Sequence, residues 1–132
     1  MVAKLPDAEK LTINIGYVDL GQIDLLVREG FYSNRTDFIR TAIRQQVGQH
    51  AESLRLAVAR KSLTLGLTHL GSAELEAARR AGEVLQLRVL GLCSIAADVT
   101  PELAHATIDS IEVLGALSAS PAVKAALANR IH

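Results

Sequence analysis

Three polar side chains stand at alternate positions near the start of the chain: Lys10, Thr12 and Asn14. Residues two apart point to the same face of a β-strand, so an ammonium, a hydroxyl and a carboxamide would lie in a row. Such a row can hydrogen-bond to an external polar surface, because it offers both donors and acceptors. Taken alone, these residues are explained more simply as the solvated face of a half-buried strand.

The residues between them are apolar and indicate what positions the polar row. Leu11, Ile13 and Ile15 would form the opposite, buried face of the strand. A single strand leaves backbone donors and acceptors unpaired on both edges. We therefore predict that a second copy of the chain pairs with this strand and that the chain forms a homodimer.

Two amphipathic helices are predicted after the strand. Asp19 is expected to cap the first helix and Gly30 to end it, while Ser33 or Asn34 is expected to cap the second. Weaker apolar spacing continues past Gly48, so either the second helix extends or a separate connecting helix begins there. The apolar positions at helical spacing are Leu20, Ile23, Leu26 and Val27 in the first helix and Phe38, Ile39, Ala42, Ile43 and Val47 in the second.

The dipeptide Leu-Gly recurs in the second half of the chain, at Leu65-Gly66, Leu90-Gly91 and Leu114-Gly115. Each copy is predicted to be an apolar strand (62–70, 84–95 and 110–119) followed by an Ala/Leu-rich helix, opened by Ser72, by Thr100-Pro101 or by Ser120-Pro121. We therefore expect an α+β protein: an N-terminal dimerisation module (1–48), a helical connector (49–61) and a strand–helix repeat domain (62–132). The last is either solenoid-like or a simple α/β packing.

Composition and charge narrow the function classes. The 132 residues carry a formal net charge of zero, so charge alone does not indicate nucleic-acid binding. Any contact with nucleic acid must depend on individual groups at specific positions. Aromatic residues make up only 3%, which argues against a stacking platform for single-stranded nucleic acid. The single Cys93 excludes an intrachain disulfide and suits a reducing compartment. With no signal pattern and no long apolar run, we expect a cytoplasmic, nucleoid-associated protein without a membrane partner.

Catalysis and metal binding find little support in the sequence. No serine stands in a nucleophile-elbow context, and no phosphate-binding loop is present. Four histidines (His50, His69, His105 and His132) and Cys93 lack the close pairing from which metal sites are built. We expect no catalytic residue, no metal and no cofactor, and we interpret Cys93 as a small core residue.

Residues 9–47 resemble the ribbon-helix-helix DNA-binding proteins of the CopG/Arc/MetJ type. The resemblance rests on the alternating strand, on Ile23-Asp24, on the run Gly30-Phe31-Tyr32-Ser33-Asn34-Arg35, and on Phe38-Ile39-Arg40 with Ala42-Ile43-Arg44. Gly16 departs from the pattern, since many relatives have proline after the strand. About a third of the chain is covered, and the remainder shows no such resemblance.

The resemblance implies a mode of binding. In that family two chains pair their strands into an antiparallel ribbon that enters the major groove of DNA. Lys10, Thr12 and Asn14 would then read base edges. Free N–H groups at the start of the second helix, around Ser33, Asn34 and Arg35, would anchor a phosphate. The dimer core would consist of Leu11, Ile13, Ile15, Leu20, Ile23, Phe38, Ile39 and Ile43.

Two function classes follow. The first is a homodimeric, sequence-specific regulator of transcription that binds double-stranded DNA, with a C-terminal domain for higher oligomerisation, for a protein partner or for sensing. The second is an assembly or partner-binding protein that uses the ribbon-helix-helix unit mainly to dimerise. An antitoxin whose C-terminal part covers a toxin is a variant of the first class.

Overall fold

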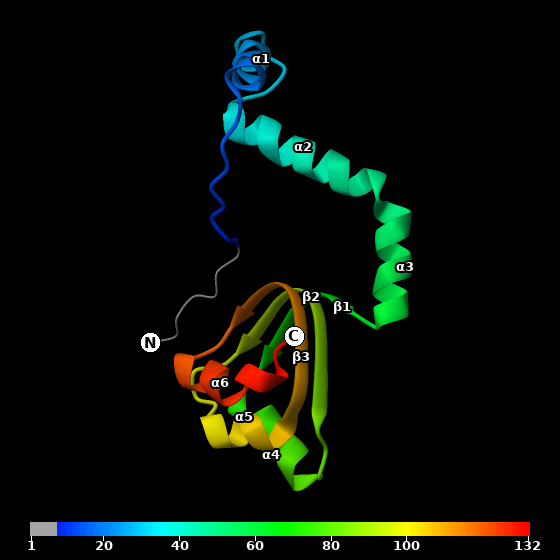
Figure 1. Ribbon diagram of the computed structural model, residues 1–132, viewed down its shortest axis with the longest axis vertical. Coiled ribbons are helices and arrows are strands. Elements are labelled where there is room, and N and C mark those ends of the chain that lie inside the picture. The colour runs from blue at the N-terminus through cyan, green and yellow to red at the C-terminus, as the bar shows by residue number, and fades with distance from the viewer. Residues whose placement is uncertain (1–7) are drawn as a thin grey trace. The chain divides into compact units, whose positions relative to one another are not determined.

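The computed structural model describes residues 8–132, which fall into two compact units. The first unit runs through Leu54 and the second spans Arg55–His132. Figure 1 shows helices and no strand in the described part of the first unit, and a sheet with helices in the second; the boundary between the units falls within the helix at Ala51–Lys61.

The first unit contains two helices, α1 (Tyr17–Arg28) and α2 (Arg35–Gln49), preceded by residues 8–16 without helix or strand. Helix α1 begins earlier than predicted, with Gly16 as its N-cap, so the expectation that Asp19 caps it is wrong. Asp19 lies instead in the first turn, where its negative charge faces the positive end of the helix dipole.

The end of α1 follows the prediction. Gly30 has a φ of +86°, the left-handed conformation that glycine adopts without a steric penalty. Its N–H donates to the Val27 carbonyl at 3.1 Å, and the Phe31 N–H donates to the Leu26 carbonyl at 3.0 Å. These two bonds satisfy carbonyl groups left free at the helix end, which confirms Gly30 as the residue that ends α1.

Helix α2 is capped by Asn34, whose side-chain oxygen accepts a hydrogen bond from the Asp37 N–H at 2.8 Å. Of the two candidates, Ser33 and Asn34, it is therefore Asn34 that caps α2. The helix passes Gly48 and ends at Gln49, and a separate helix, α3 (Ala51–Lys61), follows. The second helix therefore extends one residue past Gly48, and the connecting helix is a separate one.

The second unit alternates strands and helices: β1 (Thr64–Leu70), α4 (Ser72–Arg80), β2 (Leu85–Ile95), α5 (Pro101–Thr107), β3 (Ile108–Ser118), α6 (Pro121–Ala126) and the 3-10 turn η1 (Ala128–Arg130). The strands form one open parallel sheet in the order β1-β2-β3. Thr100 and Ser120 cap α5 and α6 directly before a proline, as predicted. The protein is thus of the α+β class, with a parallel three-stranded sheet.

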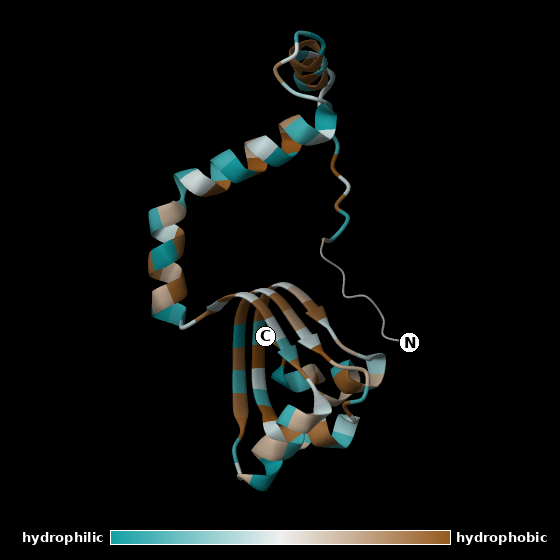
Figure 2. Ribbon diagram, turned by 180° about the vertical axis from the view of Figure 1, so that it is seen from behind, coloured by the Kyte–Doolittle hydropathy of each residue, from teal (hydrophilic) through white to brown (hydrophobic). Residues whose placement is uncertain are grey.

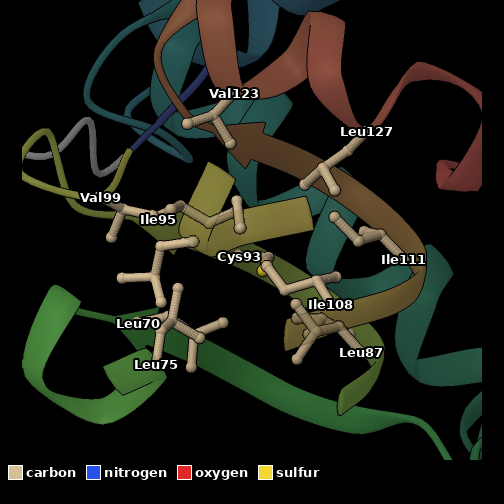
Figure 3. Packing of buried hydrophobic residues seen from close by; sticks show 13 residues of the cluster. Leu70, Leu75, Leu87, Cys93, Ile95, Val99, Ile108, Ile111, Val123 and Leu127 are labelled. Atoms are coloured by element: carbon tan, nitrogen blue, oxygen red, sulfur yellow. The ribbon is translucent and has the colours of Figure 1, made fainter. Parts of the chain in front are cut away.

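The core of the second unit lies between one face of the sheet and its helices. Figure 3 shows side chains from both layers converging there, among them Leu75 of α4, Cys93 of β2 and Ile111 of β3. All three are fully buried, with 0% of their surface exposed. Cys93 is therefore the core residue that was predicted, and burial raises the pKa of its thiol.

Three glycines stand side by side across the sheet. The strand register pairs Gly66 with Gly91 and Gly91 with Gly115. Each has a positive φ, of +119°, +140° and +122° respectively. Residues with an L side chain rarely adopt these backbone angles. Because the three glycines are neighbours across the sheet, all three strands change direction at the same point along their length. The strong curvature of the sheet in Figure 1 is consistent with this.

Candidate nucleic-acid interface

The polar row of residues 10, 12 and 14 lies at the surface of the single chain. Lys10, Thr12 and Asn14 are exposed, as base-reading residues must be. Their apolar neighbours are exposed as well, with 81% of Leu11 and 68% of Ile13 accessible to solvent, and only Ile15 is partly covered. Within one chain, residues 10–14 therefore have no hydrogen-bonded neighbouring strand and no apolar cover among the described residues. A strand at these residues stays a prediction, because it requires a second copy of the chain.

The helices of the first unit also lack cover. Among the described residues of this unit, Ile23 is the one hydrophobic side chain that is buried, with 7% exposed. Leu20, Phe38 and Ile39 are partly buried, and Ile43 is 57% exposed. A helix pair that buries a single aliphatic side chain has too small a hydrophobic core for an independently stable domain.

An aromatic contact and an ion pair hold the two helices at the turn between them. The rings of Tyr32 and Phe38 meet edge to face with centroids 5.0 Å apart. The Arg35 guanidinium forms two bonds with the Asp24 carboxylate, Nε to Oδ1 at 2.7 Å and Nη2 to Oδ2 at 2.8 Å. This hydrogen-bonded pair lowers the pKa of Asp24 below its ordinary value and raises that of Arg35.

The pairing of Arg35 limits what its side chain can offer to DNA. The resemblance implies a phosphate contact through backbone N–H groups at this helix start, and the Arg35 side chain itself binds Asp24 across the turn. Asp24 and Arg35 lie on different helices, so no helical spacing in the sequence could have paired them. Phosphate anchoring by Arg35 then rests on its backbone N–H, or on exchange of the Asp24 carboxylate for a phosphate.

The start of α2 is also occupied in part by the protein's own groups. The Ser33 N–H donates to the Asp37 carboxylate at 2.9 Å, while the Asp37 N–H donates to Asn34. These two bonds resemble a capping box, except that the carboxylate accepts from the residue before the cap, and together they fix the helix start. The first N–H groups of a helix have no partner within it, so those of Arg35 and Thr36 are the donors best placed for an anion.

The carboxylate of Asp37 places a negative charge where a phosphate is expected to bind. We predict that Asp37→Asn raises DNA affinity about two- to five-fold, because like-charge repulsion of roughly 0.5–1 kcal/mol is removed. The amide oxygen can still accept from the Ser33 N–H, so the fold should persist, and losing the negative charge at the helix N-terminus should lower stability by only about 0.3–1 kcal/mol. Titration of labelled DNA at fixed salt measures the effect, with Asp19→Asn as the same change on the other helix. A loss of affinity in Asp37→Asn would contradict this placement of the phosphate.

Other kinds of site find less support in the part of the chain that the structure describes. No group of three or more His, Cys, Asp or Glu side chains there could hold a metal ion. Nor does any helix of residues 8–132 combine the length and apolarity required to cross a membrane. A shallow pocket of about 340 Å³ lies in the second unit, lined by Ser62, Thr64, Gln86 and Arg88.

Comparison with known proteins places the sequence in a family. The sequence pattern described as the Ribbon-Helix-Helix transcriptional regulator family matches residues 6–124, which include nearly all of the second unit. An uncharacterized protein of Methanocaldococcus jannaschii is 35% identical over 49 residues, which are 37% of this chain and half of that protein's length. No solved structure matches the chain. The family pattern covers most of the sequence, and the first unit of the chain has the expected pair of helices. The chain therefore belongs to the ribbon-helix-helix family of transcriptional regulators.

Proposed function

We propose that the chain is a homodimeric, sequence-specific DNA-binding regulator that reads the major groove with a two-stranded ribbon formed by residues 9–15 of both chains. Membership of the family implies DNA binding. The observation that carries the finer proposal is the exposure of Leu11 and Ile13 in the single chain. Pairing two such segments and covering them with both helix pairs would bury these residues and leave the intervening polar row outside.

The polar row has the chemistry to discriminate bases. In the major groove a lysine can donate to guanine, and an asparagine can pair with N6 and N7 of adenine. A threonine can contact the methyl group of thymine. Because the chain has no net positive charge, we infer that affinity depends on these few positioned contacts and on the helix N-termini more than on a basic field.

The test is the double variant Thr12→Ala with Asn14→Ala. A bound sequence is first selected from a random DNA pool with the unaltered protein. The variant should then lose about 1–3 kcal/mol for each base contact removed, and its preference at those base pairs should relax. The dimer should persist, because both side chains are exposed.

A matched control for this test is Gln46→Ala, which removes an exposed amide from α2. It should leave both affinity and preference unchanged. An unaltered operator preference in the double variant would refute base reading by residues 12 and 14. A pool with no enriched sequence and a shallow salt dependence would refute the regulator proposal as a whole.

A second candidate is an assembly or partner-binding protein in which the first unit serves mainly to dimerise. Two observations favour it: the balanced charge of the chain, and large exposed hydrophobic side chains on the sheet of the second unit. The same selection from a random pool separates the candidates, because an assembly protein would enrich no sequence. A sensing role for the second unit would place its ligand in the polar pocket beside Arg88.

A further inference from the structure

The sheet of the second unit is covered on one face only. Helices α4, α5 and α6 lie on the same side of it in both views (Figures 1 and 2). For α4 and α5 this follows from the topology, since right-handed crossovers between strands added in the order β1-β2-β3 place every connecting helix on one face, and α6 after the last strand lies on that face too. The inward side chains of β2, including Leu87, Val89 and Cys93, are buried by these helices.

The opposite face of the sheet carries two rows of apolar side chains. The register aligns Leu65, Leu90 and Leu114 in one row and Leu67, Leu92 and Ala116 in the next. These six residues form the leucine face. Leu65 is 74% exposed, Leu67 61% and Leu114 47%, while the other three are partly covered by their neighbours. No charged residue belongs to the face.

An open apolar face is unusual for this kind of sheet. Purely parallel sheets occur almost only with both faces covered, because their strands are apolar on both sides. The three most exposed leucines alone leave on the order of 300 Å² of apolar surface in water, close to the largest patch found on ordinary monomers. The leucine face therefore has the character of an interface.

We propose that the leucine face packs against the leucine face of a second copy, the other chain of the ribbon-helix-helix dimer. This inference rests on the proposed function, because that dimer brings the two copies together. A free partner would gain too little, since the face is well below the roughly 800 Å² per partner of a standard stable interface. A tethered copy is present at an effective concentration on the order of millimolar, at which a weak contact suffices.

The border of the face is compatible with self-association. Arg88 and Glu112 are register partners in the next row of the outer face, and Lys61 lies beside them, so each copy presents both signs of charge at this border. The Arg88 guanidinium donates to the Lys61 carbonyl at 3.1 Å, and the Lys61 ammonium lies 3.8 Å from the Glu112 carboxylate. With both signs at this border, two identical faces meet without a large like-charge repulsion.

The experiment is chemical cross-linking of the full-length chain through a cysteine introduced at the centre of the face. Leu90→Cys lies on the middle strand, where a twofold axis within the interface brings the two copies of one residue close together. Val84→Cys is the control, because Val84 is 63% exposed and lies outside the face. The native Cys93 is fully buried and should not react. With a short thiol cross-linker, Leu90→Cys should form at least about five-fold more linked dimer than Val84→Cys.

A triple variant guards against misfolding of the cysteine variant. Leu65→Gln, Leu67→Gln and Leu114→Gln change exposed side chains, so the fold should persist. Added to Leu90→Cys, they should reduce cross-linking to the level of the control, while sedimentation still reports a dimer held by the first unit. Adding Val84→Gln to Leu90→Cys instead should leave the yield of linked dimer unchanged.

The remaining outcomes separate this inference from the proposed function. A monomeric mass for the unaltered protein would refute the proposed dimer and this pairing together. A dimeric mass with equal cross-linking at positions 90 and 84 would refute the pairing alone, and would point to a cover from the same chain. A tetramer that the triple variant reduces to a dimer would refute pairing within one dimer and place the contact between dimers.

Discussion

Replacing Gly91 with alanine is expected to unfold the second unit. A Cβ at this position would lie 2.2 Å from the carbonyl oxygen and 3.0 Å from the carbonyl carbon of Gly66, and both atoms belong to the backbone of the adjacent strand. The φ of +140° is also strained for any L side chain. Either the two strands must separate or Gly91 must leave its conformation, and each option disrupts the parallel ladder between β1 and β2.

The expected magnitude exceeds about 4 kcal/mol, comparable with the entire stability of a unit of this size. Thermal unfolding followed by circular dichroism would show the strand signal lost at room temperature, while the helices of the first unit persist. Gly66→Ala is the matched control. It has a similar φ of +119°, but a Cβ there meets no atom within 4 Å, because β1 is the edge strand.

The control should therefore cost only the conformational strain, about 1–3 kcal/mol, and should remain folded. The difference between the two variants isolates the close approach of the strands from the strain in φ. A Gly91→Ala protein that melts within a few degrees of Gly66→Ala would contradict the stacked arrangement of the glycines.

The sequence predicted local structure well where one residue type decides the conformation. Gly30 ends α1 and Asn34 caps α2, and Thr100-Pro101 and Ser120-Pro121 open α5 and α6. In each case a short-range backbone requirement selects the residue. The Leu-Gly recurrence likewise placed three strands to within two residues at most of their ends.

Features that depend on distant or absent partners were harder to predict. Asp19 resembles a helix cap, but α1 begins at Tyr17, and its N-cap is Gly16, which is extended and has no side chain to signal the helix start. The bond between Arg35 and Asp24 joins two helices across a turn, and no periodicity reports it. The recurring Leu-Gly dipeptides indicate repeated strand–helix units, whereas the close contact of their glycines appears only once the strands are in register.

Replacing Ile13 with aspartate separates the single chain from the proposed dimer more sharply than any other change. In the single chain Ile13 is 68% exposed, so a polar substitution there should change stability by less than about 0.5 kcal/mol. In the ribbon its side chain would lie beneath both helix pairs, and an unpaired buried charge would cost roughly 3–5 kcal/mol. We therefore expect the dissociation constant of the dimer to rise by at least about a hundred-fold and DNA binding to be lost with it.

Sedimentation across a concentration series measures the first effect, and DNA titration measures the second. Thr12→Asp is the matched control, because it adds the same charge one residue away on the opposite face of the predicted strand. It should keep the dimeric mass and lose DNA affinity alone, since its charge would face the bases and phosphates. If Ile13→Asp stayed dimeric at low concentration, residues 9–15 would not form the ribbon. Opposite outcomes at adjacent residues are therefore required, because alternation along a strand sends one side chain into the dimer and the next toward DNA.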